Sequence, residues 1–160
     1  MNEPNNSELQ QQQIIYNQVT ERLIGINFPS DFPRLNKAHL LVIYHNELES
    51  GGHESFLNWQ QNTVRQIGIQ PYMKDLVAAL QEIGAKDYAN VIEQFGEHMW
   101  NLFEALENGE IDESLFYEVI ELADQAYFKL NGAIRDLLEV YLLKHSKQLL
   151  EELDNSGENA

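Results

Sequence analysis

Carboxylates and imidazoles are the side chains with which this sequence could do chemistry. Eleven carboxylates and no lysine or arginine lie between Asp87 and Phe128, so these forty-two residues carry a formal charge of −11, out of −16 for the whole chain. The chain also has five histidines and no cysteine, which leaves it without a thiol nucleophile or a disulfide. Such groups could ligate a metal ion, or together they could attract a basic surface.

The spacing of the histidines argues against the metal site that would suit an acidic helical protein best. A di-iron bundle requires the motif Glu-x-x-His twice. The residues three positions before the five histidines are Asn36, Val42, Ser50, Phe95 and Leu142. Glu97 and His98 are adjacent and would point about 100° apart on a helix, so they do not converge on one ion.

The turn from Glu107 to Asp112 does not have the pattern of a calcium-binding loop. If Gly109 took the sixth position of such a loop, Leu106 would occupy the third, where an oxygen ligand is required. Phosphate-binding loops, nucleophile elbows and dinucleotide fingerprints are also absent from the sequence. The sequence therefore predicts no metal, no cofactor and no catalytic residue.

The carboxylates alternate with apolar residues at helical spacing, so we expect the acidic stretch of residues 87–128 to fold. A first apolar stripe comprises Tyr88, Ile92, Phe95, Met99, Leu102 and Leu106. Glu93, Glu97 and Glu104 lie opposite it, within about 40° of one another. After a break at Asn108-Gly109, a second stripe comprises Leu115, Val119, Leu122, Ala123 and Ala126. The pattern predicts two amphipathic helices that show carboxylates to water.

Like charges three or four residues apart cost a helix about 0.2 to 0.5 kcal/mol per pair, and the pairs in this stretch could together cost about 2 kcal/mol. The binding of a basic partner would be a functional reason for this concentration of negative charge. The residues that we predict to bind a partner are Glu93, Glu97, Glu104, Glu107, Glu110, Asp112, Glu113, Glu118, Glu121 and Asp124.

Tyr117 and Phe128 fall on the carboxylate side of the second helix, with Glu121 and Asp124. Contact with the core through another helix is one interpretation. A patch of aromatic anchors rimmed with acids is the other, and it would suit the binding of a partner or a second subunit.

The rest of the chain also has helical periodicity, and no segment alternates with the period of a strand. We predict an all-α protein of about seven helices, with a loose tail at residues 1–6, a single domain at 7–150 and an acidic tail at 151–160. Ser7 would start the first helix and Asn36 would cap the second, which would end at Ser50-Gly51-Gly52. A short helix would follow from His53 to about Asn62.

Three further features mark the later boundaries. Pro71 would stand at the first position of a helix that Gly84 ends. The last helix would contain apolar residues from Ile134 to Leu149. A break or kink is expected before it, at Asn131-Gly132.

The whole-chain composition limits the partners. At 160 residues the chain fits one domain. A pI near 4.5 disfavours direct binding to nucleic acid or to an anionic membrane. The chain starts without a basic or an apolar signal region, and its longest aliphatic run, Leu40 to Tyr44, is too short to span a bilayer. We therefore expect a soluble cytoplasmic protein.

Three segments, Leu48 to Leu57, Ala79 to Ala85 and Ile111 to Tyr117, together carry a family resemblance. Their order and spacing resemble the DNA-mimic protein family of small acidic bacterial proteins, over roughly residues 40 to 145. His53 stands where the family usually has phenylalanine. The matching residues are caps, turns and core positions, so the resemblance transfers no functional residue. It implies an all-helical, often dimeric protein that occupies the DNA-binding face of a helix-turn-helix repressor.

The favoured hypothesis is thus a binding protein, not an enzyme, whose acidic helical surface imitates DNA for a basic DNA-binding protein such as a transcriptional regulator. Glutamates four residues apart on a helix have Cβ atoms about 5 to 6 Å apart, which is comparable with the spacing of neighbouring phosphates on one DNA strand. Three alternatives stay open: an immunity-type inhibitor of a basic nuclease toxin, an acidic globular protein without mimicry, and an uncharacterised enzyme.

Overall fold

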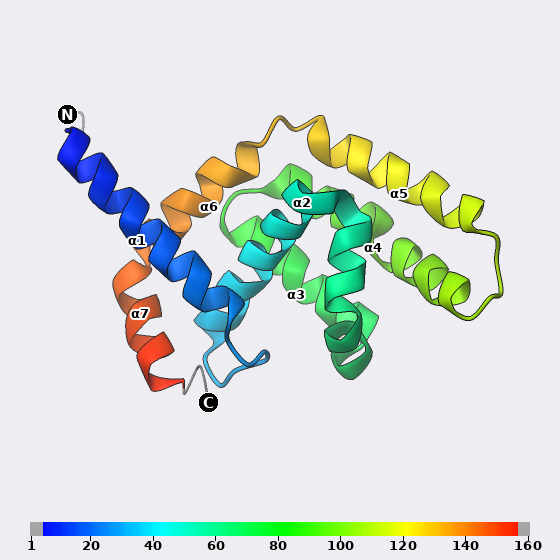
Figure 1. Ribbon diagram of the computed structural model, residues 1–160, viewed down its shortest axis with the longest axis horizontal. Coiled ribbons are helices and arrows are strands. Elements are labelled where there is room, and N and C mark those ends of the chain that lie inside the picture. Colours follow the sequence, from blue (N-terminus) through cyan, green and yellow to red (C-terminus); the bar gives the residue numbers. More distant parts are fainter. Residues whose placement is uncertain (1–4, 157–160) are drawn as a thin grey trace.

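The computed structural model describes residues 5–156, and the described part contains seven helices and no strand (Figure 1). The all-α prediction is therefore confirmed. The helices are α1 (Asn6–Ile24), α2 (Pro33–Ile67), α3 (Ile69–Glu82), α4 (Lys86–Glu107), α5 (Glu113–Phe128), α6 (Ala133–Lys144) and α7 (Ser146–Asn155).

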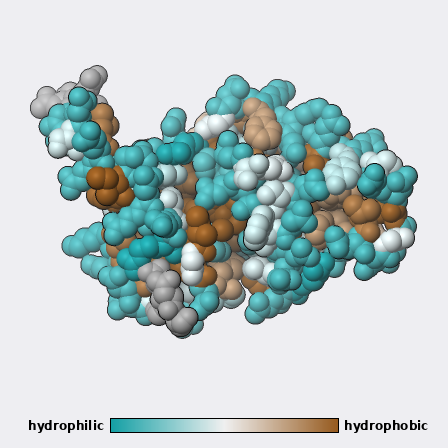
Figure 2. Space-filling model, in the orientation of Figure 1, coloured by the Kyte–Doolittle hydropathy of each residue, from teal (hydrophilic) through white to brown (hydrophobic). Residues whose placement is uncertain are grey.

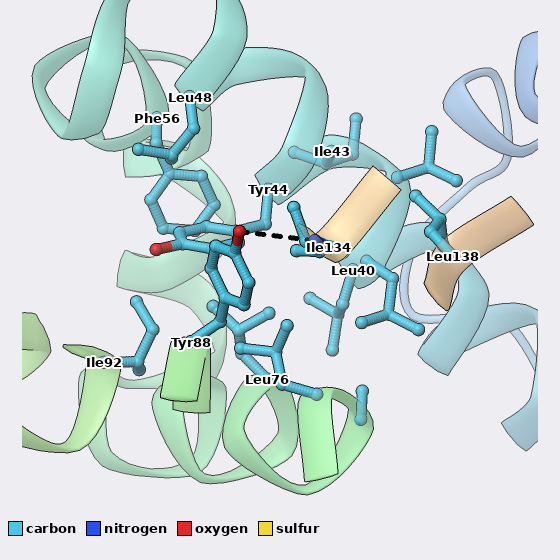
Figure 3. Close-up of a cluster of buried hydrophobic side chains, with 14 of the residues drawn as sticks. Leu40, Ile43, Tyr44, Leu48, Phe56, Leu76, Tyr88, Ile92, Ile134 and Leu138 are labelled. Carbon is cyan, nitrogen blue, oxygen red and sulfur yellow. Dashed lines mark hydrogen bonds between the residues drawn. The ribbon is translucent and has the colours of Figure 1, made fainter. Parts of the chain in front are cut away.

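The long helix α2 is the centre of the domain, since it contacts α1, α3, α5, α6 and α7. Helix α4 packs between α3 and α5, while α1, α6 and α7 form the other end of the molecule. The core includes Tyr44, Leu48 and Phe56 of α2, all at most 1% exposed. In Figure 3 these side chains meet Leu76, Tyr88 and Ile134, and the Tyr88 hydroxyl accepts a hydrogen bond of 3.3 Å from the Ile134 N–H. The face shown in Figure 2 is mostly hydrophilic, with apolar patches between the helices.

Three of the predicted helix starts are wrong. Helix α3 begins at Ile69, so Pro71 is its third residue rather than its first. Helix α1 begins at Asn6, because the Asn5 side chain accepts a hydrogen bond of 2.8 Å from the Glu8 N–H. Helix α2 begins at Pro33 rather than at Asn36. The Asn36 amide instead holds the preceding connector, accepting from the Ser30 N–H at 2.8 Å and donating to the Ser30 carbonyl at 2.9 Å.

The predicted break at the glycine pair is confirmed, because Gly51 and Gly52 both leave helical geometry and divide α2 into two helical segments. Gly52 has φ +70° and ψ −163°, and helical geometry resumes after it and continues to Ile67, beyond the predicted end at Asn62. A residue with a side chain rarely adopts such a φ, so glycine is needed at this position.

The C-terminal region has one more break than predicted. The break at Asn131-Gly132 is confirmed, with φ of +59° and +74°. A second break at His145 separates α6 from α7. Helix α7 extends to Asn155 and Leu153 is completely buried, so it enters the range 151–160 in which the sequence predicts an acidic tail. Residues 1–4 and 157–160 of the two predicted tails lie outside the described part.

The apolar stripe of α5 is only partly the one that we predicted. Leu115 and Leu122 are 49% and 51% exposed. Of the predicted stripe, Ala123 is buried and Val119 and Ala126 are partly buried. The buried line comprises Phe116, Ile120, Ala123 and Tyr127. Two apolar lines run side by side on this helix, and the line with two large aromatic rings buries more apolar area.

The predicted stripe of α4 is partly confirmed. Tyr88, Ile92 and Met99 are buried, whereas Phe95, Leu102 and Leu106 are only partly buried. Trp100 and Phe103 complete the packed face.

Candidate partner-binding surface

Eight of the ten predicted partner-binding carboxylates are exposed. They lie on α4, on the connection to α5 and on α5 itself: Glu93, Glu97, Glu107, Glu110, Asp112, Glu113, Glu118 and Glu121. The apolar faces of α4 and α5 pack inwards, which forces these residues toward solvent. We call these eight residues the acidic array.

Few cations lie against the acidic stretch. Among the described residues, one ion pair joins it to an arginine or lysine, between Arg65 Nε and Glu104 Oε2 at 4.0 Å. Glu104 is half-buried and therefore differs from the acidic array. Glu97 accepts a hydrogen bond of 3.3 Å from the Gln70 side chain, which leaves its charge in place. The acidic array therefore keeps most of its negative field.

Asp124 has a different environment from the acidic array. Its Oδ1 accepts two hydrogen bonds from His53, one from the backbone N–H at 2.9 Å and one from the ring Nδ1 at 2.8 Å. The first bond satisfies an N–H group where helical geometry resumes after the bend at Gly52, so Asp124 caps this segment from another helix. The side chain is only 27% exposed. Asp124 holds the fold together at this bend, and it presents little of its charge to a partner.

The His53 ring is completely buried and has partners on both nitrogens. Because Nδ1 donates to the Asp124 carboxylate, a neutral ring accepts at Nε2, and the Tyr44 hydroxyl donates to it at 2.8 Å. Burial, and then the nearby Tyr127, Asp124 and Tyr88, raise the pKa of Tyr44 well above its ordinary value.

Tyr44, His53 and Asp124 are hydrogen-bonded in series, as in a catalytic proton relay, but solvent and substrates cannot reach the Tyr44 end. Tyr44 and His53 are both 0% exposed. A substrate therefore cannot reach the hydroxyl, and the raised pKa of Tyr44 opposes formation of a phenolate. The arrangement stabilises the bend in α2.

Tyr117 and Phe128 are 42% and 50% exposed, so the interpretation of core contact is wrong for both. They line a groove of about 540 Å³ between α5 and the second half of α2, together with Glu54, Ile120, Glu121, Asp124 and Gln125. The Tyr117 hydroxyl donates to Glu54 Oε1 at 2.8 Å, and this bond raises the pKa of Tyr117. An aromatic groove rimmed with acids thus adjoins the acidic array, and Glu121 belongs to both.

Sequence reasoning missed the pairing of His53 with Asp124 and also Glu54. The position of His53 directly after a glycine pair was the available signal for a special site at the bend. Among the described residues, no group of three or more histidine, aspartate or glutamate side chains could hold a metal ion. No described helix is long and apolar enough to cross a membrane.

A comparison with protein families gives a match. Residues 33–145, from the start of α2 to the end of α6, match the model of the family described as DMP19-like protein. No curated protein and no solved structure gives a significant match.

Proposed function

Because the chain belongs to the DMP19-like family of DNA-mimic proteins, we propose that its acidic array occupies the DNA-binding face of a basic DNA-binding protein. A helix-turn-helix repressor is such a protein. The observation that carries the proposal is the set of eight exposed carboxylates on α4, α5 and their connection. Membership alone would not indicate which surface acts.

The charge and the spacing of the acidic array support this proposal. Glu93 and Glu97 are one helical turn apart, with Cβ atoms about 5 to 6 Å from each other. DNA-binding proteins contact phosphates largely through lysine and arginine. An anionic helix face of this spacing can therefore engage the same side chains. The field would also speed association with a basic partner.

The proposed role is regulation through binding, without catalysis by this protein. By covering the DNA-binding face of a transcriptional regulator in the cytoplasm, it would free the regulator's DNA site. A homodimer would present two such arrays to a dimeric repressor, whose two DNA-binding faces are related by the same symmetry.

A capture experiment with three immobilised proteins tests this function. The first is the wild type, and the second is an α4 variant with Glu93→Gln, Glu97→Gln and Glu107→Gln. The third is a matched control variant with Glu8→Gln, Glu21→Gln and Asp31→Asn, which loses three exposed charges elsewhere. Each is incubated with native lysate at about 0.15 M salt, where the screening length is about 8 Å.

The wild type and the control variant should retain a basic DNA-binding protein that duplex DNA releases, and the α4 variant should retain much less. Equal capture by all three proteins, or no release by DNA, would contradict the proposal. Capture of a nuclease instead of a regulator would assign the acidic array to toxin inhibition.

A further inference from the structure

The groove between α5 and the second half of α2 has features that an array of phosphates lacks. We propose that it binds arginine side chains from a basic segment of the partner protein, which lie on the rings of Tyr117 and Phe128 and pair with Glu121. This inference rests on the function proposed above and identifies how the partner would be distinguished from other basic proteins.

The two rings are held in place before any partner binds. Tyr117 packs edge-on against the buried Phe116, with ring centroids 5.2 Å apart at 65°. Phe128 packs in the same way against the buried Tyr127, at 5.0 Å and 82°. Rings that are exposed but already ordered lose little entropy on binding, and such aromatic residues are typical anchors of interfaces.

The protein already holds two of its own arginines in this manner. The Arg65 guanidinium lies 5.6 Å from the Trp100 ring centre and 4.0 Å from the Glu104 carboxylate. The Arg135 guanidinium lies 4.6 Å from the Tyr16 ring centre, and its Nε is 3.8 Å from Glu139.

The groove repeats this combination of ring and carboxylate without an arginine. None of the seven residues that line it is a lysine or an arginine. Guanidinium groups stack flat on aromatic faces and pair with carboxylates through two hydrogen bonds, whereas an ammonium group acts as a strongly hydrated point charge. Arginine from outside therefore suits the groove better than lysine.

The distance between the rings defines the occupant further. Tyr117 and Phe128 are eleven residues apart on α5, so they point in nearly the same direction and lie about 16 Å apart along the helix. One guanidinium cannot touch both rings. An extended segment advances about 3.3 Å per residue and turns successive side chains to opposite faces. Two arginines four positions apart therefore lie on one face about 13 Å apart, and their long side chains can reach the two rings. Glu121 lies between the rings and can pair with either arginine.

The test uses a probe that does not depend on the unknown partner. It is an acetylated and amidated octapeptide of glycine and serine with two arginines four positions apart. A second peptide has lysines at the same positions, and a third has its two arginines adjacent. Each is titrated into the full-length protein, and the ring protons of Tyr117 and Phe128 are followed by NMR.

The first peptide should bind more tightly than the other two and show contacts between arginine side-chain protons and both rings. Tyr117→Leu and Phe128→Leu should each weaken its binding roughly two- to fivefold, and the lysine peptide should be affected less. Trp59→Leu removes a ring that is 73% exposed outside the groove, and it should change nothing. Glu121→Gln should weaken both the arginine and the lysine peptide.

Equal binding of the arginine and lysine peptides, or unchanged binding in both ring variants, would overturn the assignment. These outcomes are separable from failure of the proposed function. If a DNA-binding protein is captured but the arginine peptide does not bind in the groove, only the proposal for the groove is refuted. A specific arginine site without capture of any DNA-binding protein would refute the mimicry.

Discussion

The carboxylate of Asp124 lies 2.9 Å from the backbone nitrogen of His53 and 2.8 Å from its Nδ1, although the two residues are 71 positions apart. This pair fastens α5 to the bend of α2. It therefore fixes Tyr117 and Phe128 of α5 relative to Glu54 of α2, so the shape of the groove depends on this contact.

Replacing Asp124 with alanine should lower the free energy of unfolding by about 2 to 4 kcal/mol. The substitution removes the acceptor for the His53 N–H and leaves a buried imidazole nitrogen unpaired. Urea unfolding followed by far-UV circular dichroism measures the change. Glu118→Ala on the exposed side of the same helix is the control, and it should stay within about 0.5 kcal/mol of the wild type. Equal effects of the two substitutions would contradict the structural role of Asp124.

Gly52→Ala should cost more stability than Gly109→Ala, although both glycines have φ +70°. At Gly109 the new Cβ has no neighbour within 4 Å, so only backbone strain of about 1 to 2 kcal/mol applies. At Gly52 the Cβ would lie 2.5 Å from Asp124 Oδ2, so the capping carboxylate must move as well. The same urea experiment compares the two variants. An equal loss of unfolding free energy would contradict this prediction, since it would mean that the Asp124 carboxylate moves aside at no cost.

The stability of the protein should fall between pH 7 and pH 5 in part through His39. Burial lowers the pKa of His39, and its hydrogen bond to the Leu23 carbonyl opposes this only partly. The unfolded chain takes up this proton near pH 6.5. The contribution of His39 to stability is thus complete above that pH. It is lost as the pH falls through the lower pKa of His39 in the folded protein.

His39→Gln removes this titration, so its free energy of unfolding should fall less than that of the wild type over the same interval. Urea unfolding at a series of pH values measures the difference. Parallel curves for the two proteins would contradict the assignment.

The α4 variant should be as stable as the wild type or slightly more stable. It removes repulsion between carboxylates three or four residues apart, about 0.2 to 0.5 kcal/mol per pair. It also removes a negative charge near the C-terminus of α4, where the helix dipole disfavours anions. Thermal unfolding measures this, and a clear loss of stability would mean that the carboxylates have stabilising contacts within the protein.

The fold was largely predictable because helical periodicity is a local property of the sequence. Glycine and proline marked most of the boundaries, and the breaks at Gly52 and Asn131-Gly132 followed from them. The start of α2 was misplaced because Asn36 bonds backward to Ser30 rather than to the first turn of the helix. Propensity at one position does not reveal which of two neighbouring backbone N–H donors a side chain will satisfy.

The surface was less predictable, since exposure depends on the other helices. Asp124 falls on the charged side of α5, and only the approach of α2 turns it into a cap. Leu115 and Phe116 are adjacent and both apolar, and packing against the neighbouring helices decides which one is buried. For the same reason the sequence left Tyr117 and Phe128 undecided between the core and the surface.

The most direct measurement of the central claim is competition with DNA. The captured DNA-binding protein is purified, bound to a labelled duplex and titrated with the wild type, the α4 variant or the control variant. The wild type and the control variant should displace the duplex equally, with less effect as the salt concentration rises, and the α4 variant should require a much higher concentration. If all three proteins displace the duplex equally, or if none displaces it, the acidic array does not imitate DNA.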